Sequence, residues 1–212
     1  MNLHRLNRHT LLLGEHSYLD MSDECYFTDA YECRLREGVR SRILALKRGH
    51  EPAIVEMAAE LAPLLPSEWT ATYTFVPMPS SSGTFGGLVS MIKRTPASDV
   101  RDLVLQDGKT PPSHNGWRLT PKERQGILIV NELVVDPQPH GVVIVDDVLT
   151  TGSHFRAAKT TIRNRWKSIR VIGLFLARAC SIAKSRCHDG ISVCPAGFDL
   201  TIIRKKLGSG LL

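Results

Sequence analysis

Residues 142–153 read V-V-I-V-D-D-V-L-T-T-G-S, and this stretch decides the fold prediction because a polar turn joins an apolar strand to a helix start. Its first four residues are all β-branched, which is typical of a strand buried on both faces of a parallel sheet. A helix is expected to begin near Ser153, and residues 171–177 predict the next strand. The apolar stripe of that helix comprises Phe155, Ala158, Ile162 and Trp166. A strand–helix–strand unit follows.

The sequence before this unit predicts more elements of the same kind. Helical spacing of apolar residues indicates helices, and β-branched or aromatic runs indicate strands. The expected helices are residues 35–46, ended by Gly49, residues 51–65 and residues 86–94. Residues 69–76 are an expected strand, and residues 127–130 and 133–135 are expected to be two short strands or one interrupted strand. Together they predict an α/β fold with a mainly parallel, twisted sheet flanked by helices.

Two regions do not fit this periodic pattern. Residues 1–30 have no clear period and are expected to form an N-terminal extension before a single domain over residues 31–212. Residues 95–124 are rich in Pro, Gly, Ser, Asp and Lys, which favours either a mobile functional loop or a disordered insert. This segment is the lid candidate. Its candidate phosphate contacts are Lys109, Arg118, Lys122 and Arg124.

Composition excludes several classes of protein. The 212 residues are 42% hydrophobic, which is enough for a buried core and too much for a disordered chain. No run approaches eighteen apolar residues, so we expect a cytoplasmic protein with no membrane association. The net charge of +6 favours anionic partners. The five cysteines form no C-x-x-C pair and predict packed thiols rather than a zinc or disulfide framework.

The turn after the apolar strand has the features of a phosphate site. A loop between a strand end and a helix start presents free backbone N–H groups at the positive end of the helix dipole. Thr150, Thr151 and Ser153 add hydroxyl donors, and Gly152 allows close approach or a positive φ. These residues therefore predict a cradle for an anion.

Asp146 and Asp147 need a different explanation, because carboxylates repel phosphate. Vicinal sugar hydroxyls or a divalent cation would satisfy them. A ribose phosphate supplies the anion and the hydroxyls together, so we expect this class of ligand. The competing interpretation is a strand-end acid pair that caps the following helix, with one hydroxyl as its N-cap.

Basic residues follow the acid pair. Between residues 148 and 188 the chain has nine Lys or Arg and no acid. Those on the helix flank, Arg156, Lys159, Arg163 and Lys167, are expected to form a solvated face rather than a nucleic-acid stripe, because no aromatic residues are interleaved with them. His154 is either a ligand contact or an exposed first-turn residue.

Residues 142–152 match, position by position, the signature of type I phosphoribosyltransferases for phosphoribosyl pyrophosphate (PRPP): four apolar residues, two acids, two variable residues, two hydroxyls and glycine. Residues 31–49, the run Val76-Pro77-Met78-Pro79 and Lys122-Glu123-Arg124 resemble the ComF-like branch of that family. The resemblance spans most of residues 31–180. It implies the type I phosphoribosyltransferase fold with a flexible hood or lid loop.

This chain also departs from the family pattern. It lacks the four-cysteine module common in ComF-like proteins, and Ser-Ser-Ser-Gly follows Pro79 where a basic stretch is usual. Thr150 stands where 6-oxopurine enzymes carry a third Asp, which disfavours hypoxanthine or guanine as the acceptor.

The resemblance implies a Mg²⁺-dependent enzyme that transfers the 5-phosphoribosyl group of PRPP to an unidentified acceptor and releases pyrophosphate. Asp146 and Asp147 would be the catalytic and metal-binding residues. The residues expected to bind the 5′-phosphate are Val148, Leu149, Thr150, Thr151, Gly152 and Ser153; those expected to cradle the pyrophosphate are Met78, Pro79, Ser80 and Ser81. The resemblance also suggests a homodimer.

Two alternatives stay open. One is a regulator that senses PRPP without turnover and uses its basic surface on nucleic acid, and the other is a ComF-like accessory protein that handles DNA. If the phosphate-loop assignment is right, Gly152→Val is expected to abolish PRPP binding while leaving the fold intact.

Overall fold

The computed structural model describes residues 2–7, 16–28, 30–32, 37–79, 86–107 and 119–180. In chain order they form β1 (His4–Arg5), β2 (Glu24–Phe27), β3 (Ala30–Glu32), α2 (Glu37–Lys47), α3 (Glu51–Leu61), η1 (Ala62–Leu64), α4 (Ser67–Thr72), β4 (Thr74–Pro77), α5 (Gly86–Ile92), β5 (Asp99–Val100), β6 (Val104–Gln106), α6 (Pro121–Gln125), β7 (Leu128–Val130), η3 (Glu132–Val134), β8 (Gly141–Leu149), α7 (Ser153–Arg165) and β9 (Arg170–Cys180).

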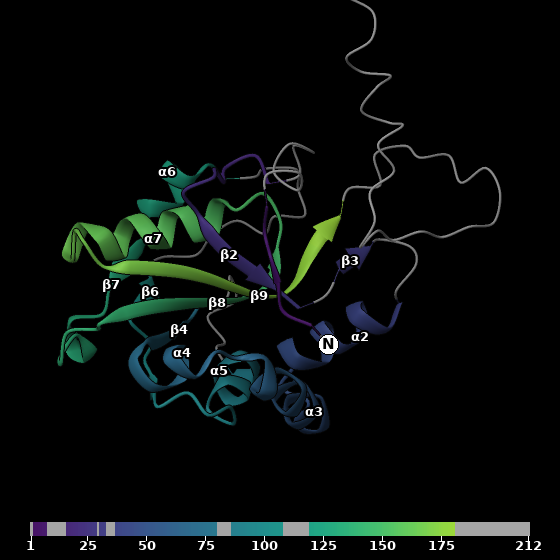
Figure 1. The fold of residues 1–212 in the computed structure, drawn as a ribbon. Coiled ribbons are helices and arrows are strands. Elements are labelled where there is room, and N and C mark those ends of the chain that lie inside the picture. The colour runs from purple at the N-terminus through teal and green to yellow at the C-terminus, as the bar shows by residue number, and fades with distance from the viewer. Residues whose placement is uncertain are drawn as a thin grey trace, which may run out of the picture. The chain divides into compact units, whose positions relative to one another are not determined.

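Within the described residues the main sheet has seven strands in the order β1-β2-β9-β8-β4-β5, and β3 also pairs with β9 (Figure 1). Among the described strands of this sheet, only the β1–β2 pairing is antiparallel. The predicted α/β fold with a mainly parallel sheet flanked by helices is therefore confirmed. Because β4 and β8 are parallel neighbours, their carboxyl ends meet at one edge of the sheet.

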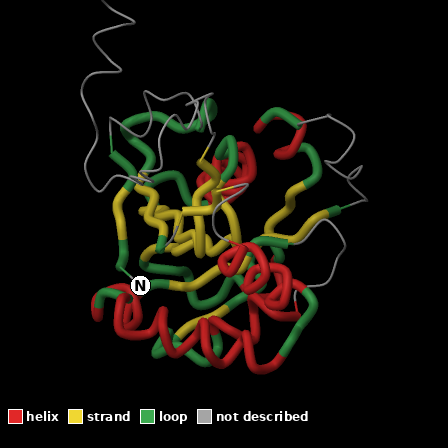
Figure 2. Tube along the Cα trace, turned by 90° about the vertical axis from the view of Figure 1, so that its right-hand side faces the viewer, coloured by secondary structure: helices red, strands yellow, loops and turns green. Residues whose placement is uncertain are grey.

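Helices cover both faces of the sheet. Val142 and Ile144 of β8 pack against α7, whereas Val143 and Val145 pack against the group formed by α2–α5. Figure 2 shows that group below the strands. The alternation follows from the two-residue period of a strand, and it explains why the apolar run of β8 is continuous.

The strand predicted over residues 69–76 is wrong in its first half. Residues Ser67–Thr72 form α4, and the strand β4 starts only at Thr74. Thr70 and Thr72 donate their hydroxyls to carbonyls three and four residues back, which accommodates β-formers in a helix. Trp69 is buried edge-on against Tyr26, so tertiary packing overrides the strand propensity.

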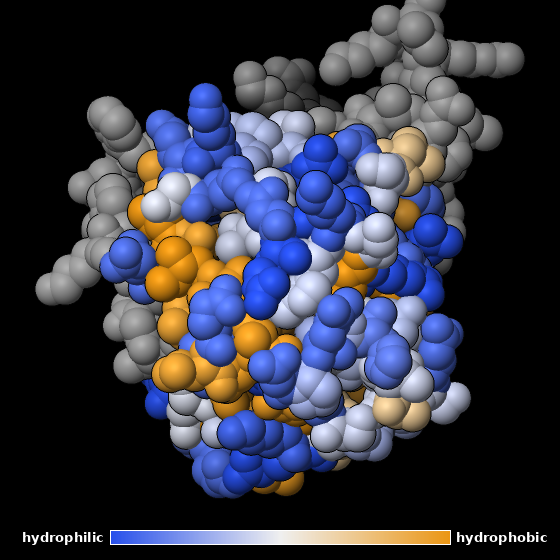
Figure 3. Space-filling view, turned by 90° about the vertical axis from the view of Figure 1, so that its left-hand side faces the viewer, coloured by the Kyte–Doolittle hydropathy of each residue, from blue (hydrophilic) through white to orange (hydrophobic). Residues whose placement is uncertain are grey.

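The expected strand over residues 133–135 is also wrong, because residues Glu132–Val134 form a 3₁₀ turn. Asn131 accepts the Leu133 amide through its side chain and starts this turn. Leu133 is 94% exposed, so its apolar side chain does not mark a buried strand. Figure 3 shows apolar residues gathered on the side of the molecule that carries β7.

The described parts of the segment 95–124, which are residues 95–107 and 119–124, are more regular than the expected loop. β6 pairs antiparallel with β7, and Leu103 and Val104 are fully buried. The segment also supplies β5 and α6, so its two ends belong to the packed structure. Lys109 and Arg118 lie outside the described residues, and the lid role stays a prediction.

The expected N-terminal extension contributes to the main sheet. β2 pairs in parallel with β9 along four residues, and Cys25 in its centre is fully buried. Burial raises the pKa of the Cys25 thiol, in keeping with a packed, unreactive side chain. In the described part of the chain, no helix has the length and apolar character needed to cross a bilayer.

Candidate phosphate-binding site

The predicted phosphate loop lies between β8 and α7. β8 ends at Leu149, α7 begins at Ser153, and Gly152 between them has φ of 82°. The expected positive φ is therefore confirmed, and it explains the glycine. The amides of Gly152, Ser153 and His154 donate no hydrogen bond to any described residue, as is usual for a helix start. Thr150 is exposed, which leaves the loop accessible at that residue.

Arg124 brings a cation to this loop from α6. Its Nε donates to Ser153 Oγ at 3.0 Å, and its Nη1 contacts His154 Nε2. A capping box between Thr120 and Glu123 fixes the start of α6 and so positions the arginine. Partial burial lowers the pKa of the Arg124 guanidinium and Asp146 offsets part of that effect, yet arginine stays charged. The predicted contact residue Arg124 thus lies beside the loop.

The two acids differ from the expectation in one respect: they lie within β8, because its ladder with β9 continues to Leu149. Adjacent strand residues point to opposite faces. Asp147 Oδ2 accordingly pairs with Lys47 Nζ of α2 at 2.5 Å, whereas Asp146 Oδ2 lies 3.7 Å from His154 Nδ1 of α7. The side chains of Asp146 and Asp147 are each 15% exposed.

The donor set limits how Mg²⁺ could bind. No group of three or more His, Cys, Asp or Glu side chains suited to a metal is present among the described residues. Mg²⁺ often takes one or two carboxylates and completes its shell with substrate oxygens and water. Asp146 and Asp147 lie on opposite faces, so they fit a metal that takes one protein carboxylate and its other ligands from a bound phosphate.

The expected pyrophosphate cradle is only partly described. Met78 donates its amide to Val145 O at 2.8 Å, so this N–H is already used by the sheet. Pro79 is buried and has no N–H. Ser80 and Ser81 lie outside the described residues. Neither Met78 nor Pro79 therefore has a free N–H for a pyrophosphate, and the cradle role of these four residues stays a prediction.

Residues 16–23, here called the N-terminal strap, contact the phosphate loop although no sequence pattern predicts it. His16 Nδ1 contacts Thr150 O, and the Tyr18 amide donates to Thr151 O at 3.0 Å. Leu19 packs against Gly152, where an added Cβ would lie 2.5 Å from Leu19 Cγ. Gly152→Val would therefore contact Leu19 as well as strain the loop, and its effect on the fold stays a prediction.

The N-terminal strap also supplies carboxylate partners for two basic residues on the flank of α7. Lys159 Nζ donates to Asp23 Oδ1 at 2.6 Å, and Arg156 Nη1 contacts Asp20 and Asp23 at 2.9 and 2.7 Å. Lys159 is only 5% exposed, so the expected solvated face is wrong at this residue. The remaining flank residues Arg163 and Lys167 are exposed, as predicted.

No protein-family model matches this sequence, and a search of curated proteins also finds no match.

Proposed function

We propose that this chain binds PRPP through the loop of residues 150–153 and transfers its 5-phosphoribosyl group to an acceptor. The observation that carries the proposal is the left-handed Gly152 at a helix start whose amides have no described partner, with the Arg124 guanidinium beside them. This is the donor set that an anion at a helix N-terminus requires. The type I phosphoribosyltransferase fold and a hood over the site belong to the same proposal.

The 5′-phosphate would be held by the loop in three ways. The amides of Gly152 and Ser153 donate to its oxygens, and the Thr150 and Thr151 hydroxyls add donors. Arg124 supplies a full positive charge at the same place. Because the loop is anchored between a buried strand and a helix, these donors need little reorganisation when the ligand arrives.

The ribose would lie toward the acids. Asp146, on the face of the sheet that carries Arg124 and His154, would accept hydrogen bonds from ribose hydroxyls. Asp147 would do so only after its ion pair with Lys47 opens. Mg²⁺ bound to one of these carboxylates and to ligand oxygens would neutralise charge on the pyrophosphate leaving group.

In the proposed reaction the acceptor forms a bond to C1 of the ribose as the C1–O bond to pyrophosphate breaks, and the leaving group takes the electron pair. Negative charge grows on the pyrophosphate, so cationic and amide donors that act on it stabilise the transition state. Exclusion of water prevents hydrolysis of PRPP.

The proposal is tested by incubating the full chain with PRPP, Mg²⁺ and a panel of nucleobases and amines, and by measuring pyrophosphate release. Release should require an acceptor and should be lost in Asp147→Asn and Asp146→Asn. Asp102→Asn, which alters an exposed carboxylate between β5 and β6, is the control. Acceptor-dependent release that persists in both site variants contradicts the assignment of the acids.

A variant at Arg124 tests the phosphate contact separately. Arg124→Gln should weaken PRPP binding by about tenfold to a hundredfold, because a charge-assisted hydrogen bond contributes roughly 1.5–3 kcal/mol. Arg163→Gln, an exposed arginine on α7, is the matched control and should leave the affinity unchanged. Titration calorimetry measures both. Equal affinities in the two variants contradict a role for Arg124 in the site.

A PRPP-binding regulator without turnover is the second candidate. The observation that favours it is the pyrophosphate loop, where the Met78 amide is occupied and Pro79 has none. A DNA-handling role receives less support, because Asp20 and Asp23 neutralise Arg156 and Lys159 on the basic flank. PRPP binding without pyrophosphate release under any acceptor would select the regulator.

A further inference from the structure

The N-terminal strap contacts the phosphate loop through the carbonyl groups of the loop. Thr150 O faces His16 Nδ1, and Thr151 O accepts the Tyr18 amide. In a trans peptide the C=O and N–H groups point in opposite directions. The N–H groups that follow these two carbonyls, those of Thr151 and Gly152, therefore point away from the strap.

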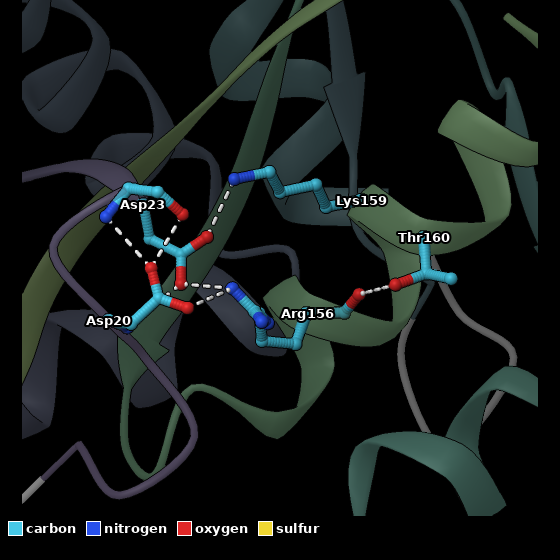
Figure 4. Close-up of polar contacts among 6 residues, drawn as sticks. Asp20, Asp23, Arg156, Lys159 and Thr160 are labelled. Atoms are coloured by element: carbon cyan, nitrogen blue, oxygen red, sulfur yellow. Dashed lines mark hydrogen bonds and ion pairs between the residues drawn. The ribbon is translucent and has the colours of Figure 1, made fainter. Parts of the chain in front are cut away.

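The strap is fastened to α7 at its other end. Asp20 and Asp23 pair with Arg156, and Asp23 also pairs with Lys159, as Figure 4 shows. The side chains of Asp23 and Lys159 are 0% and 7% exposed, so this ion pair is sheltered from solvent. The strap thus joins the loop to the first two turns of the helix whose start faces the proposed anion.

The His16 ring that contacts the loop is buried in a way that disfavours folding. Thr150 O can only accept a hydrogen bond, so the ring nitrogen Nδ1 must carry the proton that it donates. The other ring nitrogen, Nε2, is buried and has no hydrogen-bond partner in the part of the chain that the structure describes, and the residue is 1% exposed. A buried polar atom without a partner disfavours folding. The bond from Nδ1 to the loop is the one polar contact of the ring among the described residues.

We propose that the N-terminal strap is a positioning element of the phosphate loop, with His16 and Leu19 as its contact residues. His16 donates a hydrogen bond to Thr150 O, and Leu19 packs on Gly152. These contacts keep the N–H groups of Thr151 and Gly152 directed away from the strap. The identity of the anion rests on the proposed function. The shape of the loop does not, because His16 and Leu19 contact the loop itself.

The test compares His16→Leu with His16→Asn in the full chain. Asparagine places an N–H donor where Nδ1 of histidine lies, and leucine removes it. Hydrogen exchange of the amides of residues 150–154, measured without ligand, should be faster in His16→Leu and close to that of the unchanged protein in His16→Asn. The affinity for ribose 5-phosphate should fall about threefold to tenfold in His16→Leu and recover in His16→Asn, as expected for one hydrogen bond.

Leu19→Ala provides a second variant if His16→Leu does not fold, since it removes the contact with Gly152 and no hydrogen bond. It should also speed exchange in the loop. Unchanged loop exchange in both variants, or equal behaviour of His16→Leu and His16→Asn, overturns the positioning role. If the unchanged protein does not bind ribose 5-phosphate while the variants still alter loop exchange, the proposed function fails and the positioning role stands.

Discussion

At the residue scale, the local role of Gly152 could be predicted from sequence and its neighbours could not. A glycine between a strand and a helix start indicates a positive φ, because other residues are strained there. Nothing local indicates that Leu19 lies against it or that Lys159 is buried by Asp23. Each of these contacts joins residues more than 130 positions apart in the sequence. Lys159 also lies on the same flank of the helix as the exposed Arg163, so helical spacing does not distinguish the two residues.

Asp23 should be far more important for stability than Asp20. Asp23→Asn leaves the buried Lys159 ammonium without its carboxylate, so the free energy of unfolding should fall by about 3 kcal/mol. The Asp20 side chain is 54% exposed, and Asp20→Asn should cost less than about 1 kcal/mol. Urea denaturation measures both. Equal losses in the two variants would mean that the buried pair is not formed.

His16 should make stability depend on pH. Burial lowers the pKa of His16 below its ordinary value of 6.5, and Arg178 lowers it further, although the Thr150 carbonyl acts in the opposite direction. Below pH 6.5 the unfolded chain therefore binds protons more readily than the folded protein does. The stabilisation is complete above that pH and is lost as the pH falls toward the lowered pKa.

Urea midpoints at about pH 7.5 and pH 5.5 test this linkage. The unchanged protein should lose more stability on acidification than His16→Asn, which keeps the donor and removes the titrating ring. The remaining histidines are common to both proteins. An equal loss in the two proteins contradicts the assignment of a buried, neutral His16.

At the element scale, the polar composition of residues 95–124 led to a wrong prediction. Polar residues there surround a short apolar segment that lies in the core. The loop expected over residues 95–124 contains the strand β6, which begins at Val104 and pairs with β7, and Leu103 and Val104 are fully buried. The predicted strand of residues 142–145 is shorter than β8, since the acids that follow look like a turn, yet Asp146 pairs with Phe175 of β9 and the strand continues to Leu149. Helices α2, α5 and α7 agree with their predictions because their apolar spacing or boundary glycines are local signals.

Leu103→Ala tests whether the first part of this segment is core. Leu103 is fully buried, so its truncation should lower the free energy of unfolding by about 3 kcal/mol. Leu133→Ala, at a leucine that is 94% exposed, is the control and should change stability by less than about 0.5 kcal/mol. Chemical denaturation distinguishes them. If Leu103→Ala has a negligible effect on the free energy of unfolding, this part of the segment is not core, and the loop that the sequence predicts is the better description.

At the scale of the whole molecule, the architecture was predictable and the role of the N-terminus was not. A strand–helix–strand unit with a continuous β-branched run indicates a parallel sheet, which is observed. Residues 1–30 lack periodicity because β1 and β2 are short and the strap is irregular. Their importance comes from pairing with β9, a strand near the other end of the sequence.

A chain that starts at Tyr31 should fail to fold cooperatively. The truncation removes β2 from the sheet, exposes the edge of β9 and takes away Asp23, the partner of Lys159. Differential scanning calorimetry and near-ultraviolet circular dichroism should show no cooperative transition, in contrast to the full chain. A transition as sharp as that of the full chain would mean that residues 1–30 are an independent extension.

The central claim is that the loop of residues 150–153 binds the phosphate of a ribose phosphate. Backbone NMR of the full chain during titration with ribose 5-phosphate tests this claim most directly, and ribose is the control. The amide signals of Gly152, Ser153 and His154 should shift with ribose 5-phosphate and stay in place with ribose, because the phosphate is the group that these amides hold. If these three signals do not move, or move equally with ribose, the loop does not bind the phosphate.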